Sequence, residues 1–193
     1  MRTQERQTRT HEGAFQTREE GGERRIEGYF AVFDGTYEMW PGASESIDPH
    51  AFDDALTDDV RVLVDHDSRL VLGRTSAHTA ELRVDEHGLW GSVLINPEDT
   101  DAMNCYARNK RGDVTQASFG FDILDEDTEY RQDGSVHWTI KRGKLWEVSV
   151  CTFPAYRETE LKARRDDYTE VRKRQTEVWK NKLLERLRPP SGA

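Results

Sequence analysis

The chain has 193 residues, 34% of them charged, and a formal net charge of −9 at pH 7. This length suits one domain with appended segments, and the high charged fraction indicates that part of the chain lies outside a core. The sequence contains neither the apolar region of a secretory signal nor an apolar run of membrane-spanning length, so we expect neither a secreted nor a membrane-bound protein.

Charge is spread unevenly along the chain. Residues 1–25 carry six arginines and five acidic residues, residues 162–193 carry ten basic and five acidic residues, and the segment between them is acidic. An acidic body argues against nucleic acid as a partner. We predict a disordered arm over 1–25, which has almost nothing to bury, a domain over 26–161 and a basic helical tail over 162–193.

The predicted elements of the domain are mostly strands. In chain order, they are strands at 26–33 and 60–64, a hairpin of 80–84 with 88–95, a helix at 99–110, a strand at 114–123, a hairpin flanking 132–134 and a strand at 145–153. Asp99 or Thr100 is expected to cap the helix and Gly112 to end it. The fold class is therefore α+β, a mostly antiparallel, barrel-like domain with one or two packed helices.

The two cysteines, Cys105 and Cys151, lie in no CxxC motif and near no cluster with zinc-ligand spacing. They are expected to be reduced thiols. Neither a metal nor an organic cofactor is implied.

One serine lies on the polar face of the 114–123 strand. Because strand side chains alternate, Ala117, Phe119 and Phe121 face one way, and Ser118 faces the other between Gln116 and Gly120. Its hydroxyl is expected to be open on one side.

A histidine and a carboxylate complete a possible catalytic set. His66 follows the strand at 60–64, and Glu147 lies in the apolar strand at 145–153, where a carboxylate needs a partner. A serine nucleophile needs a base, and the base needs a third group to orient it. Histidine suits the base role because its ordinary pKa is about 6.5.

Structural explanations remain open for these residues. Ser118 can be a small residue in a half-buried strand, His66 a solvated loop residue, and Glu147 a partner of Arg142 or Lys144. Ser149 shares the face of Glu147 and belongs to the site or is a rival nucleophile, and Cys151 is interpreted as a core residue. Among the remaining histidines, His78 is kept as an alternative third member. Arg74 and Arg142 are candidates for stabilising an oxyanion.

Several segments resemble, in order and spacing, the HK97-type phage prohead (capsid maturation) protease family. The matching segments are 26–33, 62–67, 71–75, 85–89, 117–121 and 146–156.

The resemblance implies a serine endopeptidase with a fold like the herpesvirus assemblin proteases. It would act inside the immature capsid (prohead) in the host cytoplasm, on the scaffold or the N-terminal arm of the major capsid protein, and on itself. The portal and further copies of the chain are additional possible partners. It implies His66 as base and Ser118 as nucleophile. Glu147 is our third member, although assemblin-like enzymes use a second histidine there. Backbone N–H groups would hold the oxyanion.

Two other functions compete with this one. A non-enzymatic assembly or scaffold protein would use the acidic body and basic tail as interaction surfaces. A small-molecule esterase or amidase is disfavoured, because the sequence lacks a Gly-x-Ser-x-Gly elbow and a parallel α/β pattern.

Overall fold

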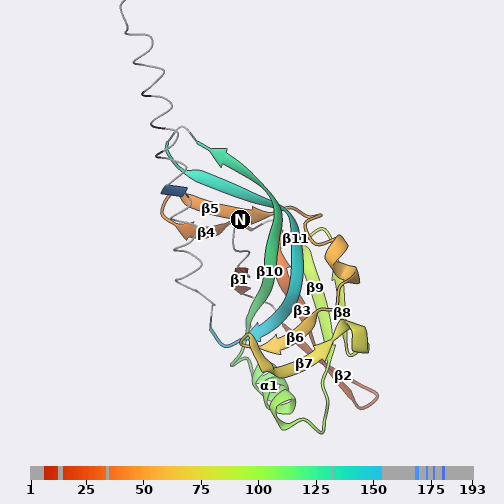
Figure 1. The fold of residues 1–193 in the computed structure, drawn as a ribbon. Coiled ribbons are helices and arrows are strands. Elements are labelled where there is room, and N and C mark those ends of the chain that lie inside the picture. The colour runs from red at the N-terminus through yellow and green to blue at the C-terminus, as the bar shows by residue number, and fades with distance from the viewer. Residues whose placement is uncertain are drawn as a thin grey trace, which may run out of the picture. The chain divides into compact units, whose positions relative to one another are not determined.

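Two long antiparallel strands, β10 and β11, carry the first sheet (Figure 1). The structure is a computed structural model that describes residues 7–12, 15–33, 35–131 and 133–153, with Tyr168, Thr169, Lys173, Thr176 and Lys180. The seven strands of this sheet are β1 (Gln7–Glu12), β4 (Tyr37–Trp40), β5 (Ala43–Ile47), β6 (Arg61–Val64), β7 (Asp67–Arg74), β10 (Gln116–Tyr130) and β11 (Val136–Cys151).

Strand β11 pairs on both of its edges. Antiparallel β10 lies along one edge, and the other edge pairs in parallel first with β5, at 136–140, and then with β6, at 147–150. β1 extends the sheet beyond β10, and β7 extends it beyond β6. The row β1–β10–β11–β6 therefore brings distant parts of the chain side by side.

The second sheet has four antiparallel strands in the order β2–β3–β9–β8. Their bounds are β2 (Gln16–Glu20), β3 (Glu23–Val32), β8 (Ala80–Val84) and β9 (Gly88–Leu94). Strands β2 and β3 form a hairpin around Gly21 and Gly22, whose φ angles are 60° and 89°. Such left-handed backbone suits a two-residue hairpin turn and favours glycine.

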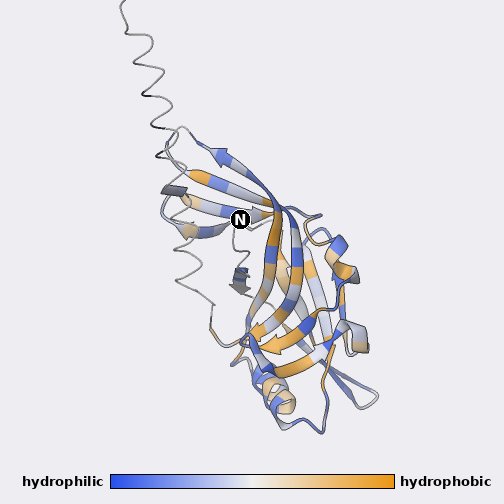
Figure 2. Cartoon of the chain, viewed as in Figure 1, coloured by the Kyte–Doolittle hydropathy of each residue, from blue (hydrophilic) through white to orange (hydrophobic). Residues whose placement is uncertain are grey.

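A single apolar cluster joins the two sheets. Phe52, which is fully buried, packs edge-on against Phe119 and Phe121 of β10, with ring centroids 5.6 and 5.8 Å apart. Residues 117–121 of β10 are buried, whereas the far end of the strand is hydrophilic and exposed (Figure 2). The two phenylalanines that follow Ser118 therefore anchor its part of β10 in the core.

The predicted helix at 99–110 is confirmed as α1 (Thr100–Arg111). The Asp99 carboxylate accepts hydrogen bonds from the backbone N–H groups of Asp101 and Ala102, and Gly112 ends the helix with a φ of 87°. Two short 3-10 helices, η1 (Asp54–Thr57) and η2 (Thr75–Ala77), complete the described elements. None of the helices in the described part of the chain is long and apolar enough to cross a membrane.

The α+β class is confirmed, but the barrel is not. Across the described strands, both sheets are open paths with free ends. The parallel pairing of β11 with β5 and β6 was not predicted, because pairing partners far apart in the chain leave no local pattern.

The disordered arm predicted over 1–25 is wrong where the structure describes it. Residues 7–12 form β1, residues 16–20 form β2, and β3 already begins at Glu23. Low hydrophobicity was misleading here because β1 is stabilised by backbone pairing with β10 and by a buried ion pair. The predicted tail over 162–193, and its boundary with the domain, lie outside the described residues apart from five isolated positions, and stay a prediction.

We expect Phe52→Ala to lower the free energy of unfolding by roughly 3–5 kcal/mol, because it leaves a cavity against two buried rings. Urea denaturation followed by circular dichroism measures the loss. Phe153→Ala is the matched control, since Phe153 is 77% exposed, and a change within about 0.5 kcal/mol is expected. Equal losses in the two variants would contradict this packing.

Candidate active site

Ser118 lies in the middle of a row of hydroxyl side chains that crosses three adjacent strands. In the strand register it is opposite Ser149 of β11 on one side and Thr10 of β1 on the other. Glu147 is opposite Gly120, two residues along the same face. The serine face and the glutamate face inferred from alternation are therefore the same face of the sheet.

His66 is presented by a tight turn between β6 and β7. Asp65 and His66 have φ angles of 50° and 59°, and Val64 pairs with Asp67 on either side of them. Two consecutive left-handed residues are typical of a two-residue hairpin turn that matches the strand twist. The Asp65 carboxylate accepts hydrogen bonds from the backbone N–H and hydroxyl of Thr152, at 2.7 and 3.0 Å, which fixes the turn to the end of β11.

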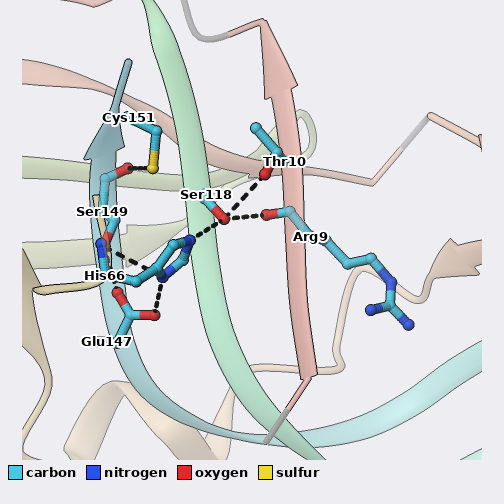
Figure 3. Close-up of polar contacts among 7 residues, drawn as sticks. All are labelled: Arg9, Thr10, His66, Ser118, Glu147, Ser149 and Cys151. Atoms are coloured by element: carbon cyan, nitrogen blue, oxygen red, sulfur yellow. Dashed lines mark hydrogen bonds and ion pairs between the residues drawn. The ribbon is translucent and has the colours of Figure 1, made fainter. Parts of the chain in front are cut away.

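Ser118, His66 and Glu147 form one chain of contacts (Figure 3). Ser118 Oγ lies 2.8 Å from His66 Nε2, and His66 Nδ1 lies 2.7 Å from Glu147 Oε1. Ser118 is fully buried, Glu147 is 3% exposed, and the His66 side chain is 10% exposed. The two ring nitrogens thus connect a hydroxyl to a buried carboxylate.

Ser149 supports this arrangement from the neighbouring position on β11. Its hydroxyl donates to Glu147 Oε2 at 2.6 Å and accepts from the His66 backbone N–H at 3.3 Å. Ser149 therefore holds both the carboxylate and the histidine backbone. Glu147 makes these contacts and does not pair with Arg142 or Lys144, the partners that the sequence had left open.

The sequence predicted an open Ser118 hydroxyl, but β1 covers it. Ser118 Oγ donates to the Arg9 carbonyl oxygen at 2.8 Å and accepts from the Thr10 hydroxyl at 3.1 Å. A carbonyl oxygen only accepts, so Arg9 and His66 Nε2 compete for the single proton of Ser118. In this arrangement β1 both covers the hydroxyl and diverts its proton.

The Arg9 side chain extends away from Ser118 (Figure 3) and pairs with Glu45 of β5. Nε lies 2.5 Å from Oε1 and Nη2 lies 2.9 Å from Oε2, while the two side chains are 6% and 0% exposed. Neither residue was among the predicted site residues, and neither were Thr10 and Asp65. Only Asp65, next to His66 at the end of an apolar strand, offered a local signal.

The rival candidates do not join this site. Burial raises the pKa of the Cys105 thiol to about 11 and that of the Cys151 thiol to about 12, so both are protonated near neutral pH. His78 is exposed at the end of η2, and Arg74 pairs with Asp59. Within the residues described, no group of three or more His, Cys, Asp or Glu side chains is arranged to hold a metal.

A hydroxyl, an imidazole and a buried carboxylate in this order can perform nucleophilic acyl transfer. The imidazole accepts the hydroxyl proton, and the carboxylate orients the ring and stabilises the imidazolium that forms. The geometry is thus suited to attack on an ester or amide carbonyl carbon held beside Ser118.

The chain is similar to two known proteins and to one protein-family model. The prohead protease of Enterobacteria phage HK97 is 29% identical over 148 residues, which span 75% of this chain and 61% of that protein. The solved structure of the bacteriophage T4 capsid assembly protease, gp21, matches 76% of this chain and 98% of its own with a TM-score of 0.48 and 12% identity. The model of the caudovirus prohead serine protease family matches residues 12–174. Since this match covers well over half of the chain, the protein belongs to the caudovirus prohead serine protease family.

Proposed function

We propose that this protein is a serine endopeptidase of phage capsid maturation, with Ser118 as nucleophile, His66 as base and Glu147 as the group that orients the base. The contact chain Ser118–His66–Glu147, at 2.8 and 2.7 Å, is the observation that carries this proposal. Family membership supports it, because the three residues fall within the matched segment.

In the proposed reaction, His66 Nε2 takes the Ser118 proton as Oγ attacks the peptide carbonyl carbon. His66 Nδ1–H donates to Glu147, which keeps Nε2 free to accept the proton. The imidazolium then protonates the leaving amine. Water attacks the resulting ester with His66 again as base, which releases the new carboxylate and restores Ser118.

The proposed substrates are the scaffold protein or the N-terminal arm of the major capsid protein, and the chain itself. The portal is a further possible partner, and the site of action is the immature capsid in the host cell. Association with capsid or scaffold proteins follows from the family's role, whereas self-association and self-cleavage rest on the resemblance alone.

Replacing the nucleophile tests the function directly. Ser118→Ala is expected to abolish discrete truncation of the co-expressed major capsid protein or of the chain, because no other hydroxyl contacts His66 Nε2 among the residues described. Intact-mass measurement reads the result, and Ser68→Ala, at an exposed serine of β7, is the matched control. Equal truncation in wild type and Ser118→Ala would contradict this role, and full-length masses in wild type would favour a scaffold protein.

Replacing the carboxylate tests the orienting role. Glu147→Gln keeps the size of the side chain but removes its charge and its preference for His66 Nδ1–H, so we expect the cleavage rate to fall roughly 100- to 10,000-fold. Timed intact-mass measurements give the rate. Glu129→Gln, at an exposed position of β10, should leave it unchanged. A rate for Glu147→Gln close to wild type would assign the orienting role elsewhere.

A thiol reagent distinguishes serine from cysteine chemistry. Because burial keeps both thiols protonated, iodoacetamide at pH 8 is expected to leave the folded protein unmodified and active. After unfolding in guanidinium, Cys105 and Cys151 should both be alkylated, as intact mass would show. Alkylation of the folded protein with loss of cleavage would argue for a thiol nucleophile.

A further inference from the structure

We propose that residues 7–12 occupy the place of a substrate strand beside Ser118, and that Glu45 selects an arginine immediately before the bond to be cleaved. This proposal rests on the proposed protease function and adds a substrate preference to it. Three observations carry it: the register of β1, the direction of the Arg9 carbonyl, and the buried ion pair of the Arg9 side chain with Glu45.

The register places a peptide across the nucleophile. β1 pairs with β10 as an antiparallel edge strand, which is a common way for an enzyme or binding domain to hold an extended peptide. Ser118 Oγ contacts the carbonyl oxygen of Arg9, so the Arg9 carbonyl group is the one nearest the nucleophile. The peptide bond offered to Ser118 is therefore the bond between Arg9 and Thr10.

The family match supports the interpretation of β1 as an occupant of the site. It begins at residue 12, the last residue of β1, whereas β10, β11, β5 and β6 all lie inside it. The edge of β10 that pairs with β1 thus belongs to the matched segment, whereas residues 7–11 of β1 lie outside it.

The Arg9 side chain is buried against an acidic partner, Glu45. Its guanidinium makes two hydrogen bonds to Glu45, at 2.5 and 2.9 Å, and lies 5.7 Å from the centre of the Phe121 ring. A planar guanidinium matches a carboxylate in this paired geometry and stacks on aromatic rings, which an ammonium or a neutral amide does less well. A substrate glutamate at this position would bring a second buried carboxylate against Glu45 and be rejected.

Cleavage at this bond follows the same chemistry as the proposed function. Ser118 Oγ bonds to the Arg9 carbonyl carbon as its proton passes to His66, the carbon–nitrogen bond to Thr10 breaks, and His66 protonates the Thr10 nitrogen. Water then hydrolyses the ester and leaves a carboxylate on Arg9. The step consumes one water and needs no other reactant.

Peptide binding tests the preference without any cleavage. The protein is the full chain carrying Ser118→Ala and Arg9→Gln, so that it does not cut and its own arginine no longer pairs with Glu45. The probes are fluorescein-labelled peptides of residues 4–15 with the natural sequence, with Arg9→Gln, or with Arg6→Gln. The last two have the same net charge and differ only in which arginine remains.

Fluorescence polarisation measures the binding. We expect the natural and Arg6→Gln peptides to bind about 10- to 100-fold more tightly than the Arg9→Gln peptide, because charge-assisted hydrogen bonds contribute in this range. Adding Glu45→Gln to the protein should remove this difference. The peptides are titrated into the millimolar range, where they compete with the tethered β1. Equal binding of the Arg6→Gln and Arg9→Gln peptides, or no binding of any peptide in that range, would overturn the proposal.

Two features keep the test decisive. A Glu45→Gln protein that shows no single thermal transition by circular dichroism is not properly folded. The comparison of the peptides on the protein that retains Glu45 then decides alone. Because every protein in the test lacks the Ser118 hydroxyl, its outcome is independent of catalysis. Failure of the preference is thus distinguishable from failure of the protease function, which is tested by truncation of the capsid protein.

Discussion

The pairing of β11 on both of its edges is the constraint on which the site depends. β11 itself carries Glu147 and Ser149, its pairing with β10 brings in Ser118, and its pairing with β6 brings in His66. A slip of one residue in either register would turn the corresponding side chain to the opposite face. Buried apolar residues such as Phe119 and Val148, which flank the polar ones, resist such a slip.

The site also depends on polar groups that are buried yet satisfied. Glu147 is nearly inaccessible to water, but each of its two oxygens has a hydrogen-bonding partner, in His66 and Ser149. Buried carboxylates are tolerated only with such partners, and losing one partner costs more than the pair gains. The same reasoning applies to Glu45, whose two oxygens are bound by Arg9. Glu147 thus fixes the base, and Glu45 separately fixes the covering strand.

Alternation along single strands was enough to predict much of the site. It placed Ser118 and Glu147 on polar positions between buried apolar ones, and the apolar strand before His66 indicated a rigid mount for the histidine. Helix α1 was predicted from its cap and its terminal glycine. In each case the signal is local, because side-chain direction and capping are set within a few residues.

What escaped sequence analysis depends on partners far along the chain. The arm was interpreted as disordered because Thr8, Arg9 and Thr10 offer little apolar surface, yet β1 is ordered by β10 and by Glu45, which are remote in sequence. The parallel pairing of β11 with β5 and β6 has the same origin. The turn at Asp65 and His66 was missed because its residues are not the usual asparagine and glycine, although both tolerate left-handed backbone.

The tether of β1 has a consequence for how the site meets other peptides. β1 ends at Glu12 and β2 begins at Gln16, so the strand over Ser118 is joined closely to the second sheet. Its occupancy is an intramolecular equilibrium that dilution does not alter, and tethered segments of this kind reach effective concentrations on the order of millimolar. A foreign peptide displaces it only at comparable concentration, a condition met where many copies of enzyme and substrate are confined in one small volume.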